Sequence, residues 1–96
     1  MNRYAYALMF DTDDNLDYNA IHKGITSMQG LCSWFHYLRS SYILISENDS
    51  NELTQQILKV IPNKRFLLFQ IYLNSRNGWM PKEAWDWIEK QSQEIL

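Results

Sequence analysis

The chain has 96 residues, of which 46% are hydrophobic and 21% charged, and its formal net charge is −2 at pH 7. This composition predicts one globular domain over residues 1–96 and excludes disorder or a dinucleotide-binding unit joined to a catalytic cap. The slight acidity disfavours capture of a nucleic acid by overall charge. The single cysteine, Cys32, excludes an intramolecular disulfide and a zinc site built from cysteines, and it fits a reducing compartment.

The longest apolar run is far shorter than the ~18–20 residues that a membrane span needs. Strand-like sequence begins directly after Arg3, so no signal peptide is predicted. We therefore expect a cytoplasmic protein without membrane contact.

The first predicted element is a strand over Tyr4–Phe10, which is apolar at every position. A strand that is apolar on both faces is typical of the interior of a sheet that is covered on two sides. The polar residues 11–15 predict a turn. From about Leu16 the apolar residues recur at helical spacing, and Gly30 lies where a C-terminal glycine would end that helix.

The middle of the chain predicts a pair of strands and a second helix. Residues 34–38 and 42–45 are rich in aromatic and β-branched side chains and indicate two short strands joined by a tight turn or a bulge. Asp49 followed three residues later by Glu52 is a capping-box pattern at the start of a helix. Pro62 ends that helix.

The last third of the chain predicts one more strand and a final helix. Residues 66–73 are apolar on both faces, apart from Gln70, and are interpreted as a second interior strand. A loop over residues 74–78 follows, and Pro81 suits the first turn of a helix whose tryptophans cover the sheet. The predicted order is therefore β-α-β-β-α-β-α.

This order predicts an α+β, ferredoxin-like βαββαβ sandwich with an additional C-terminal helix. Two right-handed crossovers that share one antiparallel sheet leave few other arrangements of four strands and two helices. Both crossover helices lie on one face, so the other face needs cover from the C-terminal helix or from a second chain. Because an open apolar face promotes association, we expect a homodimer or higher oligomer.

Two parts of the sequence resemble known proteins. The first strand ends in an aspartate, Tyr6-Ala7-Leu8-Met9-Phe10-Asp11, and in a small βαββαβ chain this resembles the CRISPR-associated endoribonuclease that also serves in spacer integration. Residues 34–44 and 78–87 are similar to SinR-like bacterial and phage open reading frames of the same fold. The resemblance implies that Asp11 faces its symmetry mate across a dimer interface and helps to bind a divalent metal.

The turn after the first strand is the one place where the sequence suggests a metal. Asp11, Asp13 and Asp14 carry the carboxylate oxygens that Mg²⁺ prefers. The alternative interpretation is a solvated turn in which one aspartate caps the following helix. Asp11 is accordingly the candidate catalytic and magnesium-binding residue, and its neighbours have weaker support.

The two histidines are assigned structural or binding roles. His22 lies beside Lys23 in the first predicted helix, which indicates a surface position, and His36 lies between aromatic residues in a strand. Histidine is a common general base, but neither residue has a nucleophile beside it in the sequence.

Aromatic residues make up 15% of the chain, more than so small a core usually holds. We expect some of them at a surface, where they anchor protein contacts or stack on bases at ~1–3 kcal/mol for each base. Trp79 lies in a loop before a helix N-terminus, which offers an indole to a base and backbone N–H groups to an anion. The residues assigned to ligand binding are Trp34, His36, Arg39, Arg76, Trp79 and Lys82.

Together these observations favour a non-catalytic homodimeric binding protein that recognises a nucleotide, a nucleic acid or a protein partner. Such a protein fits a role in phage–host defence or counter-defence, for example as an inhibitor that sequesters a nucleotide signal. Catalysis is disfavoured because it needs several convergent titratable groups, and only Asp11 has positional support. The alternative is a magnesium-dependent endonuclease that uses paired Asp11 residues at a two-fold axis.

Overall fold

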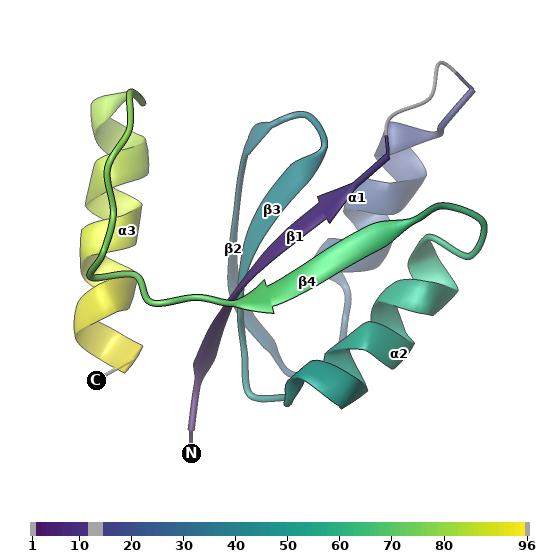
Figure 1. The fold of residues 1–96 in the computed structure, drawn as a ribbon, viewed down its shortest axis with the longest axis horizontal. Helices are drawn as coiled ribbons and strands as arrows, with labels where there is room; N and C mark the ends of the chain where they lie inside the picture. The colour runs from purple at the N-terminus through teal and green to yellow at the C-terminus, as the bar shows by residue number, and fades with distance from the viewer. Residues whose placement is uncertain (1, 12–14, 96) are drawn as a thin grey trace.

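The computed structural model of the protein describes residues 2–11 and 15–95. Its elements follow the predicted order (Figure 1): β1 (Tyr4–Phe10), α1 (Tyr18–Thr26), β2 (Leu31–Leu38), β3 (Ser41–Ser46), α2 (Ser50–Val60), β4 (Phe66–Gln70) and α3 (Lys82–Ile95). The predicted α+β class is confirmed.

The four strands form one sheet in the order β2-β3-β1-β4, and each neighbouring pair is antiparallel. Figure 1 shows α1 and α2 on one side of this sheet and α3 on the other, so the molecule has three layers. The connectivity is compatible with a ferredoxin-like arrangement of the first six elements. We call the side under α1 and α2 the first face and the side under α3 the second face.

The core under the first face forms because the apolar sides of the strands and of the two helices α1 and α2 face one another there. Alternate side chains of β1, among them Tyr6 and Leu8, point to this face and are buried. Ile25 of α1 and Ile57 of α2 pack against them and are fully buried. Burial of each such aliphatic side chain contributes ~1.5–3 kcal/mol to folding.

The second face holds a smaller core under α3. Ala5, Phe35 and Ile45 of the sheet pack there against residues of the last helix and of the segment that precedes it, namely Leu73, Ala84 and Ile88. The Trp87 indole donates a hydrogen bond to the Ser33 hydroxyl oxygen at 3.0 Å, and its ring lies 5.3 Å from the ring of Phe35. The predicted cover of the sheet by the C-terminal helix is therefore confirmed for part of this face.

The predicted capping of α2 is also confirmed, because the Asp49 carboxylate accepts a hydrogen bond from the Glu52 backbone N–H at 2.9 Å. Gly30 has φ of 87°, a backbone conformation that L side chains rarely adopt. A Cβ atom there would lie within 2.8 Å of the Asn48 side chain, so both conformation and space require glycine.

One prediction about the sheet is wrong. Residues 66–73 were expected to form an interior strand, but β4 is an edge strand that ends at Gln70. Its apolar pattern on two faces does not reflect burial on two faces, because Leu67 is 59% exposed and Phe69 is 52% exposed on the second face. After Gln70 the chain leaves the sheet and turns towards α3.

The other differences concern the ends of elements. The helix expected from about Leu16 begins at Tyr18, because the Asp17 side chain caps it by accepting from the Ala20 N–H at 3.0 Å. β2 begins at Leu31, three residues before the predicted start, and β3 extends one residue further at each end. Among the described residues no helix is long and apolar enough to cross a bilayer.

Candidate binding site

A groove of about 530 Å³ lies between α3, the segment that leads into it and the second face of the sheet. Its volume is within the ~300–1,000 Å³ of ordinary ligand pockets. Its walls are mostly aromatic and aliphatic, with a few polar groups at the rim, and it is lined by Phe35, Leu38, Ile43, Ile71, Tyr72, Leu73, Ser75, Arg76, Asn77, Gly78, Trp79, Met80, Trp85 and Ile88.

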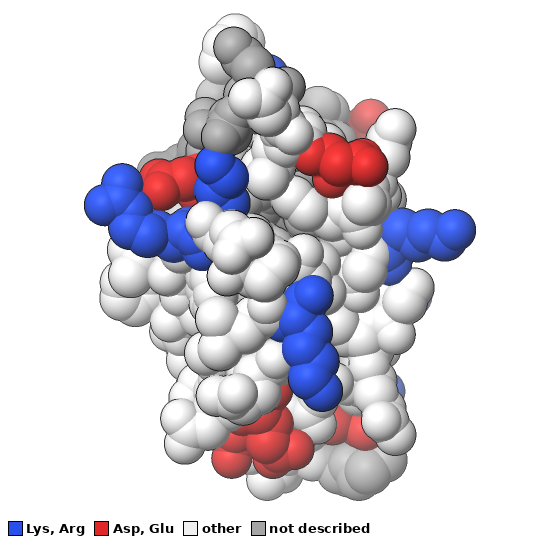
Figure 2. All heavy atoms as spheres, turned by 90° about the vertical axis from the view of Figure 1, so that its right-hand side faces the viewer, with Lys and Arg blue, Asp and Glu red and all other residues white. Residues whose placement is uncertain are grey.

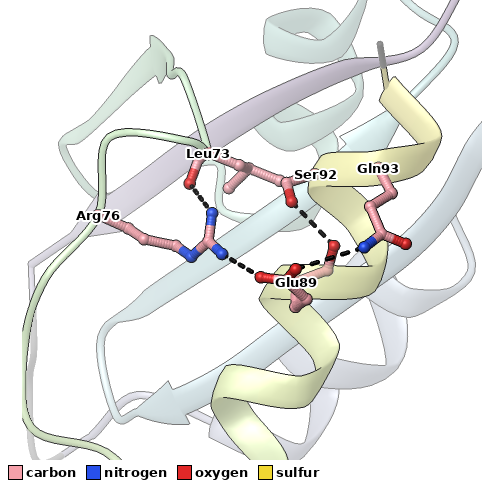
Figure 3. Close-up of polar contacts among 5 residues, drawn as sticks. All are labelled: Leu73, Arg76, Glu89, Ser92 and Gln93. Carbon is pink, nitrogen blue, oxygen red and sulfur yellow. Dashed lines mark hydrogen bonds and ion pairs between the residues drawn. The ribbon is translucent and has the colours of Figure 1, made fainter.

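A polar clamp holds one wall of the groove (Figure 3). The Arg76 guanidinium donates to the Leu73 carbonyl oxygen at 2.9 Å and forms an ion pair with the Glu89 carboxylate of α3. The Gln93 amide donates to the other carboxylate oxygen of Glu89 at 3.3 Å, and the Ser92 hydroxyl donates to the Glu89 carbonyl oxygen at 2.8 Å. The Arg76–Glu89 ion pair attaches the loop after β4 to the last helix, while the bonds of Ser92 and Gln93 to Glu89 lie within that helix.

Trp79 is the most exposed aromatic residue among those described, at 98%. It lies at the rim of the groove, between Gly78, which has φ of 153°, and Met80, which packs against the second core. The exposure is unusual because an indole normally removes 150–250 Å² from water when it packs. The backbone holds the ring beside the groove while the ring itself fills no part of the core.

The structure divides the predicted ligand residues into separate places. Arg76 and Trp79 line the groove together. Lys82 forms an ion pair at 3.0 Å with Asp86, one turn further along α3, and its side chain is largely exposed. The other predicted residues, Trp34, His36 and Arg39, lie on or next to β2.

The residues on β2 form an aromatic cluster with α1 and β3. The His36 ring stacks on the Tyr42 ring with centroids 3.9 Å apart, and His22 Nδ1 lies 2.7 Å from the Tyr42 hydroxyl oxygen. The Trp34 ring meets His22 edge-on at 4.9 Å. The expectation that His22 is a surface residue is therefore wrong, because α1 places it against the sheet.

The protonation pattern of this cluster follows from its geometry. Burial raises the pKa of Tyr42 to about 12, so its hydroxyl stays protonated at neutral pH and can either donate to His22 Nδ1 or accept from it, depending on the histidine tautomer. The Nδ1 atom of His36 lies 2.9 Å from the Ser41 carbonyl oxygen, which only accepts, so this nitrogen carries a proton. These groups satisfy one another, as expected of a structural cluster.

Arg39 has a similar internal role. Its guanidinium lies 4.4 Å from the centroid of the Tyr18 ring, a cation–π contact that ties the turn between β2 and β3 to the start of α1. Trp34 remains exposed on one side of the cluster, so it is the member that is open to a partner.

Asp11 follows the last residue of β1 and forms an ion pair with Arg65. Its carboxylate oxygen lies 3.1 Å from Arg65 Nε, and both side chains are exposed. Asp13 and Asp14 lie outside the described residues. Within residues 2–11 and 15–95, no three His, Cys, Asp or Glu side chains are placed to hold a metal ion. The magnesium role of Asp11 stays a prediction.

Charges on the described surface are dispersed. Ion pairs join Arg3 to Glu94 at 3.5 Å, Arg65 to Asp11, Arg76 to Glu89 and Lys82 to Asp86. Figure 2 shows the side formed by α1 and α2, where basic and acidic side chains alternate with uncharged ones and form no continuous basic stripe. Exposed pairs of this kind contribute little to stability.

Most of the groove could not be predicted from the sequence. Arg76 and Glu89 are separated by 13 residues and belong to no motif, and Ile43 and Met80 have the pattern of ordinary core positions. The signal that pointed to this region was the excess of aromatic residues, with Trp79 next to a glycine. Comparisons with protein-family models, with curated proteins and with solved structures give no match to this chain.

Proposed function

We propose that this protein is a non-catalytic binding protein whose groove takes apolar side chains from a peptide segment of a partner protein. The observation that carries the proposal is the nearly complete exposure of Trp79 at the rim of an apolar groove. Tryptophan, tyrosine and arginine are the residues that most often dominate binding energy at protein interfaces. Tyr72 and Arg76 lie beside Trp79 in the same lining.

The charge distribution favours a protein partner over a nucleotide or nucleic acid. The cationic group in the groove, the Arg76 guanidinium, is already engaged by Glu89 and by the Leu73 carbonyl oxygen. A phosphate would have to compete with this carboxylate. Apolar side chains make no such demand, because the groove walls are largely aromatic and aliphatic.

The ferredoxin-like architecture with an added C-terminal helix is part of this proposal, and the strand order β2-β3-β1-β4 supports it. The proposal also includes that the protein is related to the CRISPR-associated and SinR-like chains. With this kinship goes a cytoplasmic role in phage defence or counter-defence. The support is the residue pattern of the first strand and of residues 34–44 and 78–87.

Selection from a displayed library of random peptides tests the groove. Selected peptides should carry two or more apolar or aromatic residues, and Trp79→Ala should weaken their binding about tenfold or more. Trp34→Ala is the matched control, because it removes another partly exposed indole, on the opposite face of the sheet, and should leave binding unchanged.

Nucleotide titrations provide the decisive contrast. Neither AMP nor cyclic AMP should change the tryptophan fluorescence at micromolar concentration. The proposal fails if either nucleotide quenches it in wild type but not in Trp79→Ala, or if selection enriches no peptide that binds at Trp79.

A further inference from the structure

The two edges of the sheet differ in how well they are protected. At one edge, β2 shows two irregularities in its register with β3, between Leu31 and Ser33 and between Phe35 and Leu38. At the other edge, β4 pairs with β1 without irregularity over its whole length. Bulges, charges and prolines are the usual means of preventing an edge from pairing with another chain, and Phe66–Gln70 contains none of them.

The hydrogen-bond pattern shows which backbone groups of β4 face outwards. The Asp11 N–H donates to the Arg65 carbonyl oxygen at 3.1 Å, and the Ile71 N–H donates to the Ala5 carbonyl oxygen at 2.8 Å. In an antiparallel ladder every second residue makes such bonds to its neighbour, so residues 65, 67, 69 and 71 bond towards β1. The N–H and C=O groups of residues 66, 68 and 70 therefore point away from the sheet.

Nothing in the described part of the chain covers this edge. In Figure 1, β4 is the strand nearest the viewer and no other segment is drawn in front of it. On the second face, α3 packs over β2 and β3 and leaves Leu67 and Phe69 more than half exposed. Met9 of β1 lies opposite Leu67 in the register and is also exposed. An open backbone edge and an apolar patch thus coincide.

We propose that β4 pairs antiparallel with β4 of a second copy of this chain, about a two-fold axis that passes through Leu68. This register places Leu68 opposite Leu68 of the partner and Phe66 opposite Gln70 of the partner. All of these residues have outward-facing backbone groups, so each pair exchanges two hydrogen bonds. The two four-stranded sheets then form one continuous sheet.

The same register joins the exposed apolar side chains. Leu67 of each copy lies opposite Phe69 of the other as a non-hydrogen-bonded pair, the geometry in which facing side chains are closest. Both residues point to the second face, because their partners on β1, Met9 and Ala7, lie on the same side of the sheet as Ala5. Pairing therefore buries part of the patch that α3 leaves open.

Charge favours antiparallel over parallel pairing of two copies. Lys64 and Arg65 immediately precede β4. Antiparallel pairing places the positive charges of the two copies at opposite ends of the new ladder. Parallel pairing would instead bring the four Lys and Arg side chains of the two copies close together. The strand is thus complementary to itself, as a two-fold interface requires.

Light scattering combined with size exclusion tests the proposal. Wild type should elute as a dimer, and Phe69→Lys should weaken the dimer about tenfold or more, because it puts a charge into the apolar pair of each half. Tyr37→Lys is the matched control: it makes the same kind of change on β2, at the opposite edge of the sheet, and should stay dimeric. Circular dichroism establishes that each variant is folded.

A backbone variant and hydrogen exchange distinguish a dimer formed through the β4 edge from a dimer formed through another surface. Gln70→Pro removes an outward-facing N–H that bonds nothing within the sheet, and it should also weaken the dimer. The amides of residues 66, 68 and 70 should exchange more slowly as protein concentration rises. A wild-type monomer at millimolar concentration, or a dimer that persists in both Phe69→Lys and Gln70→Pro, overturns the proposal. The peptide experiment on Trp79 is independent of this one, because Trp79→Ala leaves β4 intact.

Discussion

The two faces of the sheet use similar apolar side chains for different purposes. Under α1 and α2 the residues of the first core, such as Leu8, Ile25 and Ile57, are fully buried and form a closed layer. Under α3 a smaller core around Ile45 and Ile88 is bordered by a groove and by exposed Leu67. The difference shows that a single helix covers only part of the second face and leaves apolar surface free for partners.

The largest expected effect comes from a cavity in the first core. Ile57→Ala should lower the free energy of unfolding by ~2–5 kcal/mol, because its side chain is fully buried between α2 and the sheet. Trp79→Ala, at the rim of the groove on the second face, should change it by less than ~0.5 kcal/mol, because its side chain is 98% exposed. Urea denaturation measures both. Equal losses would mean that the two faces do not differ as described.

Alkaline pH should weaken the region around α1. Burial raises the pKa of Tyr42 to about 12 from an ordinary value of 10.0, so the folded state favours the protonated phenol. The resulting stability is fully present below pH 10 and is lost as the pH rises towards 12. The loss should be no more than about 1.4 kcal/mol for each pH unit in this window.

Comparison with Tyr42→Phe isolates this contribution. The free energy of unfolding of the variant should fall less between pH 10 and 12 than that of wild type. Urea denaturation at each pH measures it. Part of the fall should remain, since burial also raises the pKa of Tyr6. An unchanged pH dependence in the variant would contradict the assignment.

Loss of the clamp on the second face should have a moderate effect. Arg76→Ala removes the hydrogen bond to the Leu73 carbonyl oxygen and the ion pair with Glu89, and it should cost ~0.5–1.5 kcal/mol. Lys82→Ala breaks an exposed pair within α3 and should cost ~0.5 kcal/mol or less. Thermal unfolding compares the two, and peptide binding should fall in Arg76→Ala alone.

The smallest effect is expected at the end of β1. Asp11→Ala removes an exposed ion pair with Arg65 and should change the free energy of unfolding by less than ~0.5 kcal/mol. With Mg²⁺ or Mn²⁺ added, wild type should cleave neither RNA nor DNA. Cleavage that disappears in Asp11→Ala would instead establish the endonuclease alternative.

Local sequence features predicted the elements well. The cap at Asp49 and the stop at Pro62 depend on neighbours within a few residues, and the structure places both where the pattern indicates. Helical spacing also placed Ala84, Trp85 and Ile88 on the covering face of the last helix, and all three pack into the second core.

The role predicted for Gly30 was wrong, because α1 ends at Thr26 with Ser27 as its C-cap and Gly30 forms the turn into β2 instead. The surface position assigned to His22 was also wrong, because no local pattern shows that Tyr42, twenty residues away, supplies a hydrogen-bond partner.

The candidate site was predictable only in part. The aromatic excess indicated a binding surface, and Arg76 and Trp79 do lie together in the groove. Trp34, His36 and Arg39 were grouped with them, but their ring contacts are with residues of α1 and β3 on the first face of the sheet. Residues that are distant in the chain come together through strand order, and composition contains no information about that order.

The sequence by itself determined which segments become strands and helices, because hydrophobic period, caps and breakers act over one or two turns. Tertiary structure alone decided that β1 lies inside the sheet and β4 at its edge, although both strands are apolar on two sides. Burial of a strand depends on which chain segments pair with it, and that pairing is a property of the whole fold.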